Sequence, residues 1–119
     1  MAGFEKHSGG CHCGAVRYEA DVDLGNTMTC NCSICQKRGS ILTFTTPDKF
    51  NLLKGEGAQT EYRFNKHAIG HLFCKTCGIL SFAKGKTPDG KEMIAVNARS
   101  LDDIDLDGLS PKKVDGRSF

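Results

Sequence analysis

GGCHCG at residues 9–14 and FCKTCG at residues 73–78 determine how this chain folds. The first stretch carries Cys11 and Cys13, and the second carries Cys74 and Cys77. Cysteines so close together along the chain rarely form a disulfide without straining the backbone, but their thiolates can converge on one ion. Structural zinc takes four such ligands in a closed tetrahedron. The sequence therefore predicts a structural zinc site that ties the N-terminal segment to a distant turn.

The remaining three of the seven cysteines are Cys30, Cys32 and Cys35. Catalytic zinc usually has three protein ligands and leaves its fourth position open for water or substrate. The triplet therefore predicts a second, open zinc site, at which these cysteines are the candidate catalytic residues. Lys37 and Arg38 follow directly and would offset the negative charge of zinc bound by thiolates, although solvated surface positions explain them equally well.

A disulfide scaffold is the competing interpretation of a small chain rich in cysteine. The cysteine count is odd, and the N-terminus, MAGFEKHSGG, has neither the basic start nor the apolar run of a signal peptide. We therefore expect metal rather than disulfides, in the reducing environment of the cytoplasm.

Length and charge limit the function classes. The chain has 119 residues, which predicts one domain over residues 1–119, with a polar C-terminal tail over about 108–119. Its formal net charge is +2, and no basic block stands out, so nucleic acid is not an expected partner. No apolar run approaches the length that spans a membrane, so a membrane is not expected either.

Short alternating segments predict a mainly β protein with little helix. The expected strands cover residues 15–20, 41–46, 50–54, 60–64, 71–74, 80–84 and 92–98. A turn is expected at Pro88 and Gly90, and short helical pieces after Cys32 and at 100–104, the latter capped by Ser100. The expected core includes Phe44, Phe64, Phe73 and Phe82, and Arg99 is expected to form a structural ion pair with Asp102 or Asp103.

Four motifs resemble the glutathione-dependent formaldehyde-activating enzyme family, whose domain is shared with centromere protein V. They are GGCHCGAVRY at 9–18, CNCSICQKRG at 30–39, FCKTCG at 73–78 and VNARSLD at 96–102. The resemblance implies an Mss4-like fold of short antiparallel strands and coiled sheets organised around zinc. It also implies two zinc sites, a structural one at Cys11, Cys13, Cys74 and Cys77 and one on the substrate side at Cys30, Cys32 and Cys35, whose full occupancy is left open.

The reaction implied by the resemblance is that of a carbon-sulfur lyase. Formaldehyde and glutathione, or a similar small-molecule thiol, would condense to S-hydroxymethylglutathione, or the adduct would be cleaved. The proton donor is not identified: His12, His67 and His71 have suitable chemistry, but ordinary packing or surface roles explain each of them better. The chain is shorter than the namesake enzyme, so glutathione contacts from additional segments are expected to be missing.

Two other interpretations stay open at this point. The chain can be a non-catalytic zinc-binding module for a protein partner, which an exposed apolar patch would favour, whereas a pocket beside the triplet would favour an enzyme. The triplet can also be a metal-free cluster of redox-active thiols.

Overall fold

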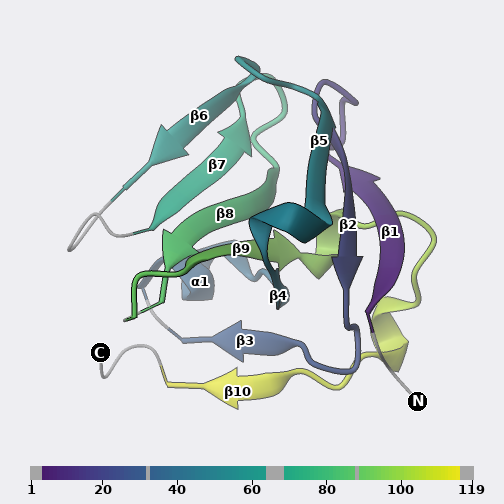
Figure 1. The fold of residues 1–119 in the computed structure, drawn as a ribbon, viewed down its shortest axis with the longest axis vertical. Helices are drawn as coiled ribbons and strands as arrows, with labels where there is room; N and C mark the ends of the chain where they lie inside the picture. The colour runs from purple at the N-terminus through teal and green to yellow at the C-terminus, as the bar shows by residue number, and fades with distance from the viewer. Residues whose placement is uncertain (1–3, 32, 64–68, 88, 116–119) are drawn as a thin grey trace.

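Two antiparallel-rich β-sheets form the body of the protein (Figure 1). The structure, a computed structural model, describes residues 4–31, 33–63, 69–87 and 89–115. The small sheet has the order β1 (Glu5–Gly10), β2 (Arg17–Val22), β5 (Phe50–Lys54). The large sheet has the order β10 (Lys112–Val114), β3 (Met28–Cys30), β4 (Leu42–Thr45), β9 (Glu92–Asn97), β8 (Leu80–Lys86), β7 (Gly70–Cys74), β6 (Gln59–Tyr62).

Helix is scarce among the described residues. It consists of α1 (Ser33–Arg38) and three single 3₁₀ turns, η1 (Pro47–Lys49), η2 (Ala98–Ser100) and η3 (Leu106–Gly108). In this part of the chain, none of the helices has the length and apolar character needed to cross a membrane. The prediction of a mainly β protein with little helix is confirmed.

Each of the seven expected strands corresponds to a strand of the structure, with ends shifted by a few residues. The segment after Cys32 forms α1, as expected. The expected helix at 100–104 is wrong: the turn there is η2, and the side chain of Asn97, not of Ser100, caps it by accepting a hydrogen bond from the Arg99 N–H. The expected turn residue Pro88 lies outside the described residues.

Strands β1, β3 and β10 were not expected from the sequence. Strand β1 is EKHSGG, in which apolar and polar residues do not alternate, and β3 and β10 have three residues each. Such short or polar strands carry too little periodicity to be read from sequence. Within the segment expected to be a polar tail, Lys112–Val114 pairs in parallel with β3.

The core lies where the two sheets meet. Tyr18 and Phe82 are almost fully buried, and Phe50 packs on both rings, with ring centroids 5.3 and 4.6 Å away. The buried Tyr18 hydroxyl shares a 2.6 Å hydrogen bond with Ser100 Oγ, which satisfies its polar end. The core residues thus join β2 and β5 of the small sheet to β8 and β9 of the large one.

Two side-chain expectations need correction. Phe44 is 38% exposed and is not a core residue; Phe73 is half-buried, and Phe64 lies outside the described residues. Asp102 pairs with Arg17 of β2 rather than with Arg99, which donates instead to the Gly39 carbonyl oxygen at 3.2 Å. Arg17 and Asp102 lie far apart in the sequence, so only the folded chain reveals their pairing.

The end of β1 has no room for a residue larger than glycine. A Cβ at Gly10 would collide with the carbonyl oxygen of Val16, and that oxygen accepts a hydrogen bond from the Cys11 N–H at 3.1 Å. The close approach of the two backbones sets the turn that carries Cys11 and Cys13.

We predict that Gly10→Ala destabilises the protein by about 2–3 kcal/mol, because a backbone oxygen held by its own hydrogen bond cannot move aside without strain. Gly57→Ala is the control: Gly57 has a positive φ of 84° but no neighbour near its Cβ, so a cost of only about 1 kcal/mol is expected. Urea unfolding of both variants measures the difference, and equal losses would contradict the close approach at Gly10.

Candidate metal centre

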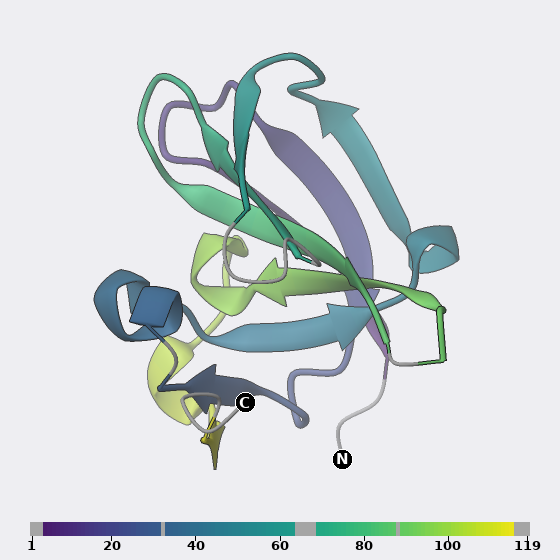
Figure 2. The same cartoon turned by 90° about the vertical axis from the view of Figure 1, so that its left-hand side faces the viewer.

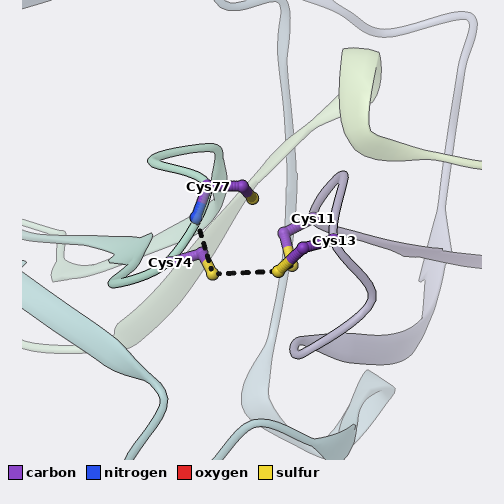
Figure 3. A group of neighbouring side chains, drawn as sticks. All are labelled: Cys11, Cys13, Cys74 and Cys77. Carbon is purple, nitrogen blue, oxygen red and sulfur yellow. Dashed lines mark hydrogen bonds between the residues drawn. The ribbon is translucent and has the colours of Figure 1, made fainter.

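Four cysteine sulfurs from two distant turns meet at one point (Figure 3). Cys11 and Cys13 lie in the turn between β1 and β2, and Cys74 and Cys77 lie at the turn between β7 and β8. All four sulfur atoms are within 4.8 Å of one another. The Sγ atom of Cys13 is 3.6 Å from those of both Cys11 and Cys74.

The local backbone explains why these turns present their sulfurs to each other. Cys74 ends β7, and its carbonyl oxygen accepts the Gly78 N–H at 2.9 Å, which closes a tight turn. Gly78 has a φ of 79°, a conformation that glycine adopts without steric cost. The turn folds back between Cys74 and Gly78, so Cys77 returns toward Cys74. The spacing of Cys74 and Cys77 in the sequence thus fits the tight turn that the structure forms between β7 and β8.

The donor set and its geometry fit zinc. Four sulfurs at Zn–S distances of about 2.3 Å in a tetrahedron lie roughly 3.8 Å apart, close to the observed 3.6 Å separations. Backbone N–H groups also point at sulfur: Val16 donates to Cys11 at 3.3 Å, and Thr76 donates to Cys74 at 3.4 Å. Such donors offset the negative charge of a site made only of thiolates. The four cysteines can therefore hold a metal ion.

The pKa values of the cluster follow from these donors. Amide N–H groups of Cys13 and Ile79 lower the pKa of Cys77 to about 6, and the amides of Cys77 and Thr76 lower that of Cys74. For Cys13, the Ala15 amide lowers the pKa, but contact with the Cys74 sulfur, burial and the other two cysteines raise it to about 11. The cluster therefore favours thiolates at some positions while keeping a proton at another, a proton that a bound cation would displace.

The structure describes two of the three cysteines of the triplet. Cys30 ends β3 and is half-buried, and Cys35 is 7% exposed in α1, which lies against β3 (Figure 2). Cys32 lies outside the described residues. The structure therefore places Cys30 and Cys35 of the expected open site, and the arrangement of all three sulfurs stays a prediction.

Arg38 is the cation at this second group of cysteines. Its Nη2 lies 3.7 Å from the Cys35 Sγ, its Nε donates to Ser40 Oγ at 3.2 Å, and its Nη1 lies 3.2 Å from His71 Nδ1. The guanidinium can only donate, so His71 accepts at Nδ1. Lys37, the other cation expected near the metal, is exposed. The position of Lys37 and Arg38 shortly after Cys35 in the sequence indicated a cation here. Nothing in the sequence indicated that Arg38 contacts His71 of β7.

The three histidines considered as proton donors are placed differently. His71 is 6% exposed, and burial and then the neighbouring Arg38 lower its pKa to about 4. It is therefore neutral near pH 7 and is not an imidazolium acid. His12 is exposed, and His67 lies outside the described residues.

Comparisons with known proteins agree with this geometry. The model of the family described as "Glutathione-dependent formaldehyde-activating enzyme" matches residues 6–115, a range that includes all seven cysteines. A crystal structure of a Rhodobacter sphaeroides protein superposes with a TM-score of 0.79 at 29% sequence identity. The superposition covers 89% of this chain and 97% of the other.

We predict that Cys11→Ser and Cys74→Ser each cost about 4 kcal/mol or more of folding stability, because loss of a structural metal is among the largest single-residue effects. Cys35→Ser should leave a folded protein that contains less metal. Chemical unfolding and elemental analysis of the three variants test this. Equal destabilisation by all three would contradict a division into one structural and one open site.

Acid is expected to destabilise the protein in part through His71. Its folded pKa of about 4 lies below the ordinary 6.5, so the unfolded chain binds more protons between these values. Stability that is present above pH 6.5 is therefore lost as the pH falls toward 4. His71→Asn keeps an acceptor for Arg38 but removes the titration, so its unfolding midpoint should change less over this range. His7→Asn is the control variant. A wild-type profile of unfolding midpoint against pH that runs parallel to that of His71→Asn would contradict the prediction.

Proposed function

The chain belongs to the glutathione-dependent formaldehyde-activating enzyme family, and from this premise we propose that it is a zinc-dependent carbon-sulfur lyase. The proposed reaction joins formaldehyde and glutathione, or a similar thiol, to give S-hydroxymethylglutathione, or runs in reverse. In the forward direction the thiol loses its proton, a carbon-sulfur bond forms, the carbonyl π bond breaks, and the resulting alkoxide takes up one proton.

The contact between Arg38 and Cys35 carries the proposal. A guanidinium 3.7 Å from a buried cysteine sulfur favours an anionic sulfur at that position. In the motif CNCSICQKRG at 30–39, the positive charge of Arg38 in QKRG thus stabilises a negative charge on Cys35 in CNCSIC. A site of this kind suits chemistry on thiols better than a purely structural role.

In the proposed enzyme, Cys11, Cys13, Cys74 and Cys77 hold a structural zinc, and Cys30, Cys32 and Cys35 hold the zinc on the substrate side. When bound at the triplet, zinc supplies a Lewis acid that stabilises a thiolate at neutral pH. Arg38 orients the Cys35 sulfur and adds positive charge beside it. Neutral His71 accepts a hydrogen bond from Arg38 and so fixes the guanidinium, which makes it a positioning residue rather than the proton donor.

We also propose that residues 1–119 form a single domain with an Mss4-like fold. The shared core of the two sheets and the four-cysteine cluster that connects them support this. None of the six cysteines among the described residues forms a disulfide, and we propose the reducing cytoplasm as the place where the protein works.

The alternative is a non-catalytic zinc-binding module for a protein partner. Such a module needs an exposed apolar surface, and the exposed large apolar residues of the described chain include Phe4, Leu53, Tyr62 and Ile79. A pocket beside Cys30 favours the enzyme instead.

Formaldehyde-dependent loss of free thiol tests the proposed function. Zinc-loaded protein is mixed with formaldehyde and a panel of small thiols, and the rate is compared with metal-free protein and with Cys35→Ser. The proposal expects faster conversion of at least glutathione or one similar thiol by the loaded protein only. Rates equal to the metal-free control for every thiol would favour the binding module.

Arg38→Met should weaken metal binding at the triplet by about tenfold or more, the usual effect of removing a group that supports a metal ligand. A chromophoric chelator that competes for zinc measures this without any enzyme assay. Lys37→Met removes a neighbouring exposed charge and should change little. Arg38→Lys should restore only part of the affinity, because one ammonium group cannot reproduce the three-way contact of the guanidinium. Equal effects of Arg38→Met and Lys37→Met would refute the role of Arg38.

A further inference from the structure

A cavity of about 310 Å³ lies where β8 ends and β9 begins, beside the turn η1. Its walls include Pro47 of η1, Lys84 and Lys86 of β8, and Glu92 and Ile94 of β9. Figure 1 shows β8 and β9 side by side within the large sheet. A cavity of about 150 Å³ can hold benzene, so this one has room for a molecule of about ten non-hydrogen atoms.

The alternation of side chains along the two strands places both lysines on one face of the sheet. Lys84 and Lys86 are two positions apart and point to the same side as Phe82, which is part of the core. Their register partners on β9 are Ile94 and Glu92, respectively. Register partners point to the same side of a sheet. Two cations, one carboxylate and one buried apolar side chain therefore share this face.

The charges around the cavity leave one positive charge in excess. Arg63 also lines the cavity, but Glu61 accepts from its Nε at 3.0 Å and from its Nη2 at 3.2 Å, so this pair is neutral. Neither Lys84 nor Lys86 forms an ion pair within the part of the chain that the structure describes. Glu92, opposite Lys86, offsets one of the two lysines. An occupant with a single negative charge would make the cavity neutral.

Apolar surface lies next to these cations. Ile94 is 4% exposed and belongs to the core, and Pro47 lines the cavity from η1. The Lys84 Nζ lies 5.9 Å from the centroid of the Phe82 ring, within the range of a cation–π contact. The methylene stems of the lysines add further apolar surface. A ligand with an apolar body and one acidic group therefore matches the cavity better than an inorganic anion does.

We propose that this cavity is a binding site for a small organic acid. The carboxylate of the acid lies between the ammonium groups of Lys84 and Lys86, and its apolar body lies against Ile94 and Pro47. Glu92 stands next to the carboxylate and disfavours ligands with a second negative charge.

The cavity lies apart from both groups of cysteines. On β7, the register partner of Lys84 is Gly70, the first residue of the strand, whereas Cys74 is the last. His71 follows Gly70 and therefore points to the other side of the sheet, where it contacts Arg38. The inference is thus independent of the proposed function, because neither set of metal ligands takes part in this site.

Lys91 provides a matched control. It is exposed and absent from the cavity walls, and it directly precedes Glu92. The Thr87 N–H donates to the Lys91 carbonyl oxygen at 2.8 Å, which extends the pairing of Lys86 with Glu92 by one residue. Lys91 therefore points to the side opposite to Glu92. Lys91→Gln removes the same charge as Lys84→Gln or Lys86→Gln, but on the other face.

NMR titration of the isotope-labelled, zinc-loaded protein with phenylacetate, and with its neutral analogue phenylacetamide, tests the site. We expect the amide signals of Gly85, Lys86 and Ile94 to shift saturably with the acid but not with its neutral analogue. Lys84→Gln and Lys86→Gln should each weaken binding about threefold, in keeping with partly exposed charges, and Lys91→Gln should leave it unchanged. Glu92→Gln should strengthen binding, because it removes a negative charge next to the carboxylate.

Cys35→Ser is a second control, because a carboxylate could also bind zinc at the triplet. This variant should bind phenylacetate as tightly as the wild type does, whether or not the protein consumes thiol. Loss of binding in Cys35→Ser would place the acid at the triplet and overturn the inference. Equal shifts with phenylacetate and phenylacetamide, equal weakening by Lys86→Gln and Lys91→Gln, or no shift at millimolar phenylacetate would also overturn it.

Discussion

The meeting of four cysteine sulfurs is the interaction on which the rest of the structure depends. Cys11 and Cys13 follow a strand of the small sheet, Cys74 ends a strand of the large sheet and Cys77 follows it, so a metal held by all four would join the two sheets at one end. The aromatic core joins them elsewhere. A chain of 119 residues has a modest core, so a metal link adds stability that burial alone supplies with difficulty.

Strand β7 connects the four-cysteine site to the proposed reactive one. It carries Cys74 at its end and, three residues earlier, His71, which holds the guanidinium of Arg38. Arg38 in turn contacts Cys35 in the helix that follows β3. Contacts through Arg38 therefore link Cys35 to the strand that also carries Cys74, and β10 pairs with β3 beside Cys30.

The sequence predicts the parts of this arrangement that are coded locally. Cysteine doublets beside glycines indicate metal turns, and alternating apolar residues indicate strands such as β2 and β9. The sequence does not show pairings between distant residues that lack such a pattern. The partner of Asp102 is Arg17, the partner of Arg38 is His71, and the polar segment KKV pairs with β3 although its composition suggests a tail. These contacts follow from the topology of the sheets, which local periodicity does not determine.

X-ray absorption at the zinc edge of protein purified under reducing conditions, combined with elemental analysis, tests the central claim most directly. Cys35→Ser, which leaves the four-cysteine cluster intact, isolates the structural site. The account predicts about one strongly retained zinc in this variant, with a shell of four sulfurs at about 2.3 Å and no nitrogen or oxygen ligand. A protein that folds stably without metal, or a shell with fewer than four sulfurs, would contradict a fold held together by Cys11, Cys13, Cys74 and Cys77.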